Sequence, residues 1–97
     1  MTKHHFSSGV YAREMTLKEG FYAETHSHKY DHLSILSSGA VIVESNNESH
    51  FYEAPACIEI KAEVKHKITA LSDVVWFCIH ATEETDIEQL DEVLIKE

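Results

Sequence analysis

The sequence lacks several features that mark disordered, disulfide-rich or membrane-spanning chains. It has one proline in 97 residues, and 43% of its residues are hydrophobic, which excludes a disordered tail or a low-complexity linker. Its two cysteines, Cys57 and Cys78, lie far apart, so we expect reduced, buried thiols unless the fold brings them together. No stretch approaches the roughly 18 apolar residues of a membrane span or has the apolar core of a signal peptide. We therefore predict a cytoplasmic protein with no membrane partner.

Basic residues are also few. Eight Lys and Arg against 17 Asp and Glu give a formal net charge of -9, and the basic residues form no cluster. We therefore expect no nucleic-acid partner, because a phosphate backbone favours a basic surface. The length allows one compact core and no second, so we expect a single domain over residues 1–97.

Short stretches of β-branched and aromatic residues, separated by small polar or glycine-containing breaks, are typical of an antiparallel all-β domain. The break Ser45-Asn46-Asn47-Glu48 predicts a hairpin turn, because Asn tolerates the left-handed backbone of tight turns. The expected strands are Val10–Thr16, Phe21–His28, His32–Ser37, Ala40–Glu44, His50–Ala54, Cys57–Ile60, His66–Leu71 and Val74–Ala81.

The last residues change to a helical period. Thr85 as N-cap and Glu88 form a capping box, which predicts a helix over Asp86–Ile95. Its apolar stripe would pack across the barrel or against a partner subunit. The stripe consists of Ile87, Leu90, Val93 and Leu94.

Histidine is the unusual component, with eight in the chain. His26 and His28 are two apart in an expected strand, so they project from one face with room for one ion between them. The same parity places Tyr22 and Glu24 on that face. His32 opens the next expected strand and can meet the pair. Three imidazoles from neighbouring strands suit Zn, Fe, Ni, Cu or Mn and leave positions for another ligand.

This region resembles the first motif of the cupin superfamily: glycine, five residues, His-x-His, three or four residues, Glu, six residues, glycine. Gly20, His26, His28 and Gly39 stand at the motif positions, and His32 replaces the glutamate. The resemblance covers about residues 19–81. It implies a cupin-like antiparallel β-barrel, also called a double-stranded β-helix or jelly roll, with one divalent metal ion inside.

The resemblance also implies that His66 closes the metal site, because it matches the histidine of the second cupin motif. The other motif residues, normally glycine, proline, glycine and asparagine, are here Pro55, Lys61, Glu63 and Ala70. His32 is either a fourth ligand or a neighbour that hydrogen-bonds to a ligand or acts as a general base. Four neutral ligands would leave the site dicationic and favour an anionic molecule.

Other residues have two interpretations each. Tyr22, Glu24 and Tyr30 are the candidate proton donors or acceptors, although a tyrosine in a β core usually only packs. Arg13 either clamps a carboxylate or forms a surface salt bridge. His80 shares its parity with Trp76 and Cys78 and faces either the cavity or the surface, so it is outside the predicted ligand set of His26, His28, His32 and His66.

Three functions compete at this point. One is a metal-dependent enzyme, such as an iron-dependent dioxygenase, an isomerase or a lyase, that acts on a small polar or anionic molecule. The second is a non-catalytic module that binds or senses a metal or small ligand. The third is a structural barrel that works through its dimer interface. Small cupins pair by packing sheets or exchanging edge strands, so the resemblance implies a homodimer.

Overall fold

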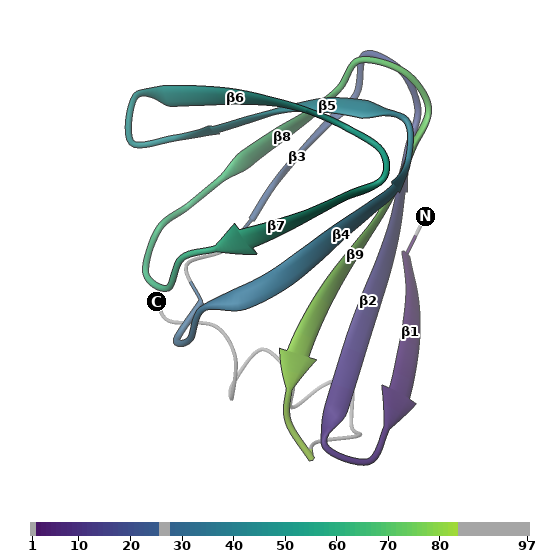
Figure 1. Cartoon of the computed structure of the whole chain (residues 1–97), viewed down its shortest axis with the longest axis vertical. Helices are drawn as coiled ribbons and strands as arrows, with labels where there is room; N and C mark the ends of the chain where they lie inside the picture. The colour runs from purple at the N-terminus through teal and green to yellow at the C-terminus, as the bar shows by residue number, and fades with distance from the viewer. Residues whose placement is uncertain (1, 26–27, 84–97) are drawn as a thin grey trace.

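The computed structural model describes residues 2–25 and 28–83, which contain β-strands and no helix (Figure 1). The predicted helix over Asp86–Ile95 lies outside the described residues. The strands are β1 (Thr2–Ser7), β2 (Val10–Leu17), β3 (Tyr22–Glu24), β4 (His32–Ser38), β5 (Ala40–Ser45), β6 (Glu48–Glu53), β7 (Ala56–Ile60), β8 (Lys67–Ala70) and β9 (Val74–Ala81). Over the described ranges, no helix is long and apolar enough to cross a membrane.

The strands form two antiparallel sheets. One has the order β1-β2-β9-β4-β7 and the other the order β3-β8-β5-β6. Figure 1 shows the two sheets facing each other, with β4 passing into β5 from one sheet to the other. The predicted all-β antiparallel barrel is thus confirmed.

Alternate side chains of each strand fill the space between the sheets. On β4, His32, Ser34 and Leu36 are buried, whereas Leu33 and Ile35 face outward and are exposed. This alternation is the period-2 pattern of a strand with one buried face. The apolar core contains Leu36, Val41, Val43, Ile58, Ile60, Ile68, Ala70, Val74 and Trp76.

Two strands differ from the sequence prediction by more than two residues at an end. β3 ends at Glu24 rather than at His28, because its partner β8 begins at Lys67, which pairs with Glu24. β1 was not predicted, because the residues near a chain end usually fray. Here the segment forms a ladder with β2, from Thr2 opposite Met15 to Ser7 opposite Val10.

The β5–β6 turn agrees with the sequence prediction, and the cysteines agree with it only in part. Asn46 and Asn47 have φ values of 47° and 65°, as the predicted hairpin turn requires. Both cysteines are free thiols, Cys57 exposed and Cys78 half-buried. The expectation of two buried thiols is therefore wrong for Cys57. Side chains along β7 alternate between the inner and the outer face of the sheet, and Cys57 lies on the outer face.

Candidate metal centre

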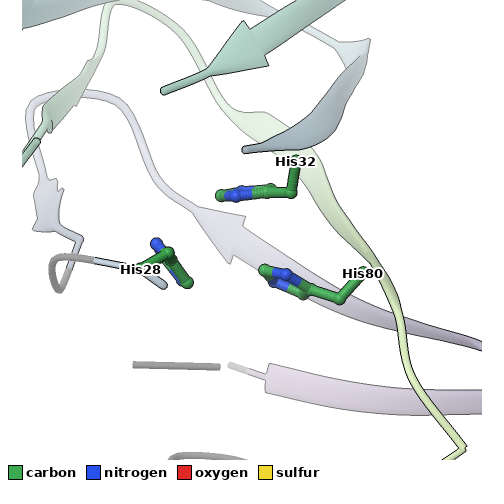
Figure 2. A group of neighbouring side chains, drawn as sticks. All are labelled: His28, His32 and His80. Atoms are coloured by element: carbon green, nitrogen blue, oxygen red, sulfur yellow. The ribbon is translucent and has the colours of Figure 1, made fainter. Parts of the chain in front are cut away.

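Three histidines from distant parts of the sequence meet at one end of the space between the sheets. They are His28 in the connection before β4, His32 at the start of β4, and His80 near the end of β9 (Figure 2). Their candidate ligand nitrogens all lie within 4.8 Å of one another, and each residue is less than a tenth exposed. We call this group the histidine triad.

Strand register explains why His32 and His80 meet. β4 and β9 are antiparallel neighbours, with Leu33 opposite Ile79. One residue further along the same ladder, His32 and His80 come opposite each other and point inward, and their ring centroids are 4.2 Å apart. His28 completes the group, with ring centroids 4.6 Å from His32 and 5.1 Å from His80.

The triad fits a divalent transition metal. Both ring nitrogens of His32 are buried, and no hydrogen-bond partner for either exists in the described part of the chain. A buried polar atom without a partner is costly, and a metal ion removes that cost. Ligand nitrogens about 2.0–2.1 Å from a zinc ion lie no more than about 4.2 Å apart, which is close to the 4.8 Å within which the candidate ligand nitrogens of the triad lie.

The electrostatics keep the imidazoles of His32 and His80 neutral and able to coordinate a metal. Burial, with additional repulsion from His80 and His28, lowers the pKa of His32 from 6.5 to about 3. Burial, followed by the charges of His28 and Arg13, lowers the pKa of His80 to about 4. A neutral imidazole offers a lone pair to a metal, so at neutral pH neither side chain has to lose a proton first.

These pKa values predict that the metal-free protein loses stability as the pH falls below about 6.5. In the unfolded chain, His32 and His80 bind protons near pH 6.5, whereas in the folded chain they do so only near 3 and 4. The unfolded state therefore binds more protons in this window, and acid favours it. From pH 7 to pH 5 each imidazole contributes about 2 kcal/mol of lost stability.

Urea unfolding of the metal-free protein at pH 7 and pH 5 measures this loss. His32→Gln should reduce the loss by about 2 kcal/mol, the contribution of one buried imidazole. His50→Gln serves as the matched control, because His50 is exposed on β6. If His32→Gln loses as much stability as the unaltered protein, the buried imidazole is not the source of the pH dependence.

His66 is buried beside the triad but is not a member of the group within 4.8 Å. Its Nδ1 lies 3.0 Å from the Val64 carbonyl oxygen. A carbonyl only accepts, so Nδ1 carries the hydrogen and Nε2 keeps the lone pair. Its backbone N–H donates to Thr25 Oγ1 at 2.9 Å, and its charge contributes to the low pKa of His32. Burial lowers its own pKa.

The other predicted site residues have different positions. His26 lies outside the described residues. Tyr22 is 57% exposed and its ring centroid lies 4.5 Å from Lys67 Nζ. The sequence predicted that Tyr22 lines the cavity, but Ala23 takes the inward side, because it pairs with the buried Ile68. The parity argument fails because β3 ends before the histidines.

Glu24 and Tyr30 border two cavities on either side of His80. A cavity of about 160 Å³ has Glu24, His28 and His80 in its wall, together with Arg13 and Cys78. A second, of about 290 Å³, is lined by Tyr30, Asp31, His80 and Ala81. His80 is thus the triad member that both cavities reach.

His80 is the site residue that the sequence analysis left undecided. Its strand parity with Trp76 and Cys78 was the available signal. Trp76 is fully buried, and side chains two and four residues along a strand share its face. An assignment of Trp76 to the core would therefore have placed His80 inside.

Comparisons with known proteins identify the fold. No protein-family profile and no curated protein sequence matches this chain. Among solved structures, it is similar to a cupin superfamily protein from Desulfitobacterium hafniense, with a TM-score of 0.73, 13% identity, and coverage of 84% of this chain and 75% of that one. The chain therefore has the cupin fold.

Two further similar structures have descriptions that name a role. One is the Cupin_2 domain of an XRE family transcriptional regulator from Enterobacter cloacae, with a TM-score of 0.73, 13% identity, and coverage of 87% of this chain and 97% of that one. The other is salicylate 1,2-dioxygenase from Pseudoaminobacter salicylatoxidans, with adducts of gentisate. Its TM-score is 0.77 at 13% identity, and the match covers 96% of this chain but 27% of the dioxygenase.

Proposed function

We propose that the protein holds one divalent metal ion through His28, His32 and His80 and binds a small polar or anionic molecule there. The observation that carries this proposal is the triad itself, with candidate ligand nitrogens within 4.8 Å of one another. The two unpartnered, buried nitrogens of His32 add support. Imidazole ligands suit Fe, Zn, Ni, Mn and Cu.

His66 and His26 are included in the proposal as further ligands predicted from the resemblance. His66 offers Nε2 in the tautomer that coordinates a metal, because Nδ1 is held by the Val64 carbonyl. His26 follows Thr25, whose backbone N–H donates to the His66 carbonyl at 2.8 Å. This link between the two segments supports a shared role.

The donor set determines what chemistry the site favours. A divalent ion held only by neutral imidazoles keeps its full charge and acts as a Lewis acid toward an oxygen of the bound molecule. Glu24 and Tyr30 border the two cavities beside His80, so we propose them as the groups that accept or donate a proton. Tyr22 was predicted for the same role but lines neither of these two cavities. The Lys67 ammonium lies over its ring instead.

We propose an oxygen-dependent reaction as the enzymatic form of this function. Protein loaded with Fe²⁺ should consume oxygen in air when supplied with small carboxylates or diketones. His28→Ala should abolish the uptake and leave the far-ultraviolet circular dichroism unchanged, because His28 lies in a connection rather than in a strand. Equal uptake by the unaltered protein and His28→Ala would contradict the enzyme proposal.

The second candidate is a non-catalytic sensing module. The similar Cupin_2 domain from Enterobacter cloacae, which matches this chain over 97% of its own length, is part of a transcriptional regulator. This candidate requires metal or ligand binding without turnover. The oxygen-uptake experiment separates the two, because a sensing module binds one metal per chain and consumes no oxygen.

We also propose a cytoplasmic homodimer formed through the outer face of the five-stranded sheet. Leu33 is 50% exposed and Ile35 is 37% exposed on this face. Their neighbours on β9 are Ile79 and Phe77, so the apolar residues are contiguous. Sedimentation equilibrium should give twice the chain mass, and Leu33→Lys should give one chain mass. A monomeric unaltered protein would contradict this assembly.

A further inference from the structure

Arg13 is half-buried and lines the cavity beside the triad. It lies on β2 directly opposite Cys78 of β9, and both residues line the cavity of about 160 Å³. Its Nε donates a hydrogen bond of 3.0 Å to the hydroxyl of Tyr11, which is completely buried. The Tyr11 hydroxyl also lies 2.6 Å from His4 Nδ1. The guanidinium is therefore held at the cavity wall by a fixed partner.

Strand register places Arg13 next to the triad. Tyr11 is opposite His80 and Arg13 is opposite Cys78, so Arg13 is a diagonal neighbour of His80. Diagonal neighbours in a sheet lie within reach of long side chains.

The cavity wall is selective in charge. Arg13 contributes a positive charge, and that charge is one cause of the lowered pKa of His80. Met15, Ala23 and Ile68 contribute apolar surface. Glu24 is the acidic member of the wall. Arg13 therefore attracts an anion, and Glu24 repels a second negative group on the same molecule.

We propose that this cavity binds a small monocarboxylate, with its carboxylate on the Arg13 guanidinium and its carbon chain against Met15, Ala23 and Ile68 beside the histidine triad. A guanidinium binds a carboxylate through two parallel hydrogen bonds. The inference rests on the proposed function in that it names the class of small anionic molecule that is bound beside the metal centre. Glu24 disfavours a dicarboxylate, because its own charge repels a second carboxylate.

Calorimetric titration of metal-free protein with propionate and with succinate tests this site, because a bound metal ion would itself attract a second carboxylate. Propionate should bind the unaltered protein more tightly than succinate. Arg13→Met should weaken propionate binding at least about 10-fold, the usual size of a lost charge-assisted contact. Lys18→Met is the matched control, because Lys18 is exposed and lies outside the strands. This substitution removes one positive charge, as Arg13→Met does, without changing the cavity.

Two further variants refine the outcome. Arg13→Lys keeps the charge and the fold but loses the two-pronged contact, so its propionate affinity should fall between those of the unaltered protein and Arg13→Met. Glu24→Gln should reduce the ratio of the propionate affinity to the succinate affinity. Equal propionate affinity in Arg13→Met and Lys18→Met, with both folded, would overturn the carboxylate site.

The design separates this proposal from the metal proposal. If the protein retains Zn²⁺ but Arg13 has no effect on propionate, the metal centre stands and the carboxylate site fails. If the protein retains no Zn²⁺, the metal proposal fails, and the same titrations on metal-free protein still decide whether propionate depends on Arg13.

Discussion

Replacing His80 with alanine should lower the affinity of the protein for Zn²⁺ more than about 100-fold. Loss of a residue that only orients a ligand already costs about 10–100-fold, and His80 offers a nitrogen within 4.8 Å of those of His28 and His32. Competition between the protein and a chelating dye for Zn²⁺ measures the affinity. The fold should persist, because His80 lies near the end of β9 and outside the apolar core.

Two control variants make this result specific. His50→Ala should change Zn²⁺ affinity less than about 2-fold, because His50 is exposed on β6. His66→Ala distinguishes the two ligand sets, since His66 belongs to the set implied by the resemblance but not to the triad. If His66→Ala abolishes binding and His80→Ala has no effect, the triad is not the metal site.

Replacing Gly39 with alanine should destabilise the protein by about 2–5 kcal/mol. Gly39 has φ of +88°, and an added Cβ would lie 2.2 Å from the Asp73 carbonyl oxygen and 2.9 Å from Val74 Cγ2. The left-handed backbone alone costs a residue with a Cβ about 1–2 kcal/mol, and the clash adds about 1–3 kcal/mol. Urea unfolding measures the difference.

Gly20 provides a matched control for this prediction. It has φ of +87°, but an added Cβ would meet nothing within 4 Å. Gly20→Ala should therefore cost only the backbone term, about 1–2 kcal/mol. Equal losses of unfolding free energy in Gly39→Ala and Gly20→Ala would show that the close contact with Asp73 contributes nothing to the loss of stability.

Much of the fold could be predicted because its signals are local. The strand Val74–Ala81 has the same limits in the sequence prediction and the structure, most other predicted strands differ by one or two residues at an end, and the Asn46-Asn47 turn follows from side chains that tolerate positive φ. Glu63 is instructive. It stands where the second cupin motif has glycine, yet it adopts φ of +64°, so the turn persists without the residue that favours it.

The site was harder to predict because it depends on which residues face each other across strands. The sequence shows that His28 and His32 are close in the chain, but His80 joins them only through the β4–β9 register. Tyr22 is exposed rather than in the cavity wall, because the strand parity that linked it to the histidines ends with β3. Arg13 had two open roles until its inward position on β2 was known.

X-ray absorption at the zinc edge, on protein loaded with one Zn²⁺ per chain, tests the metal centre most directly. The account predicts a first shell of nitrogen or oxygen at about 2.0–2.1 Å with the outer-shell pattern of several imidazoles. It predicts no sulfur at about 2.3 Å, although Cys78 lies in the wall of the adjacent cavity. A shell without imidazole, a sulfur ligand, or failure to retain zinc would contradict the account.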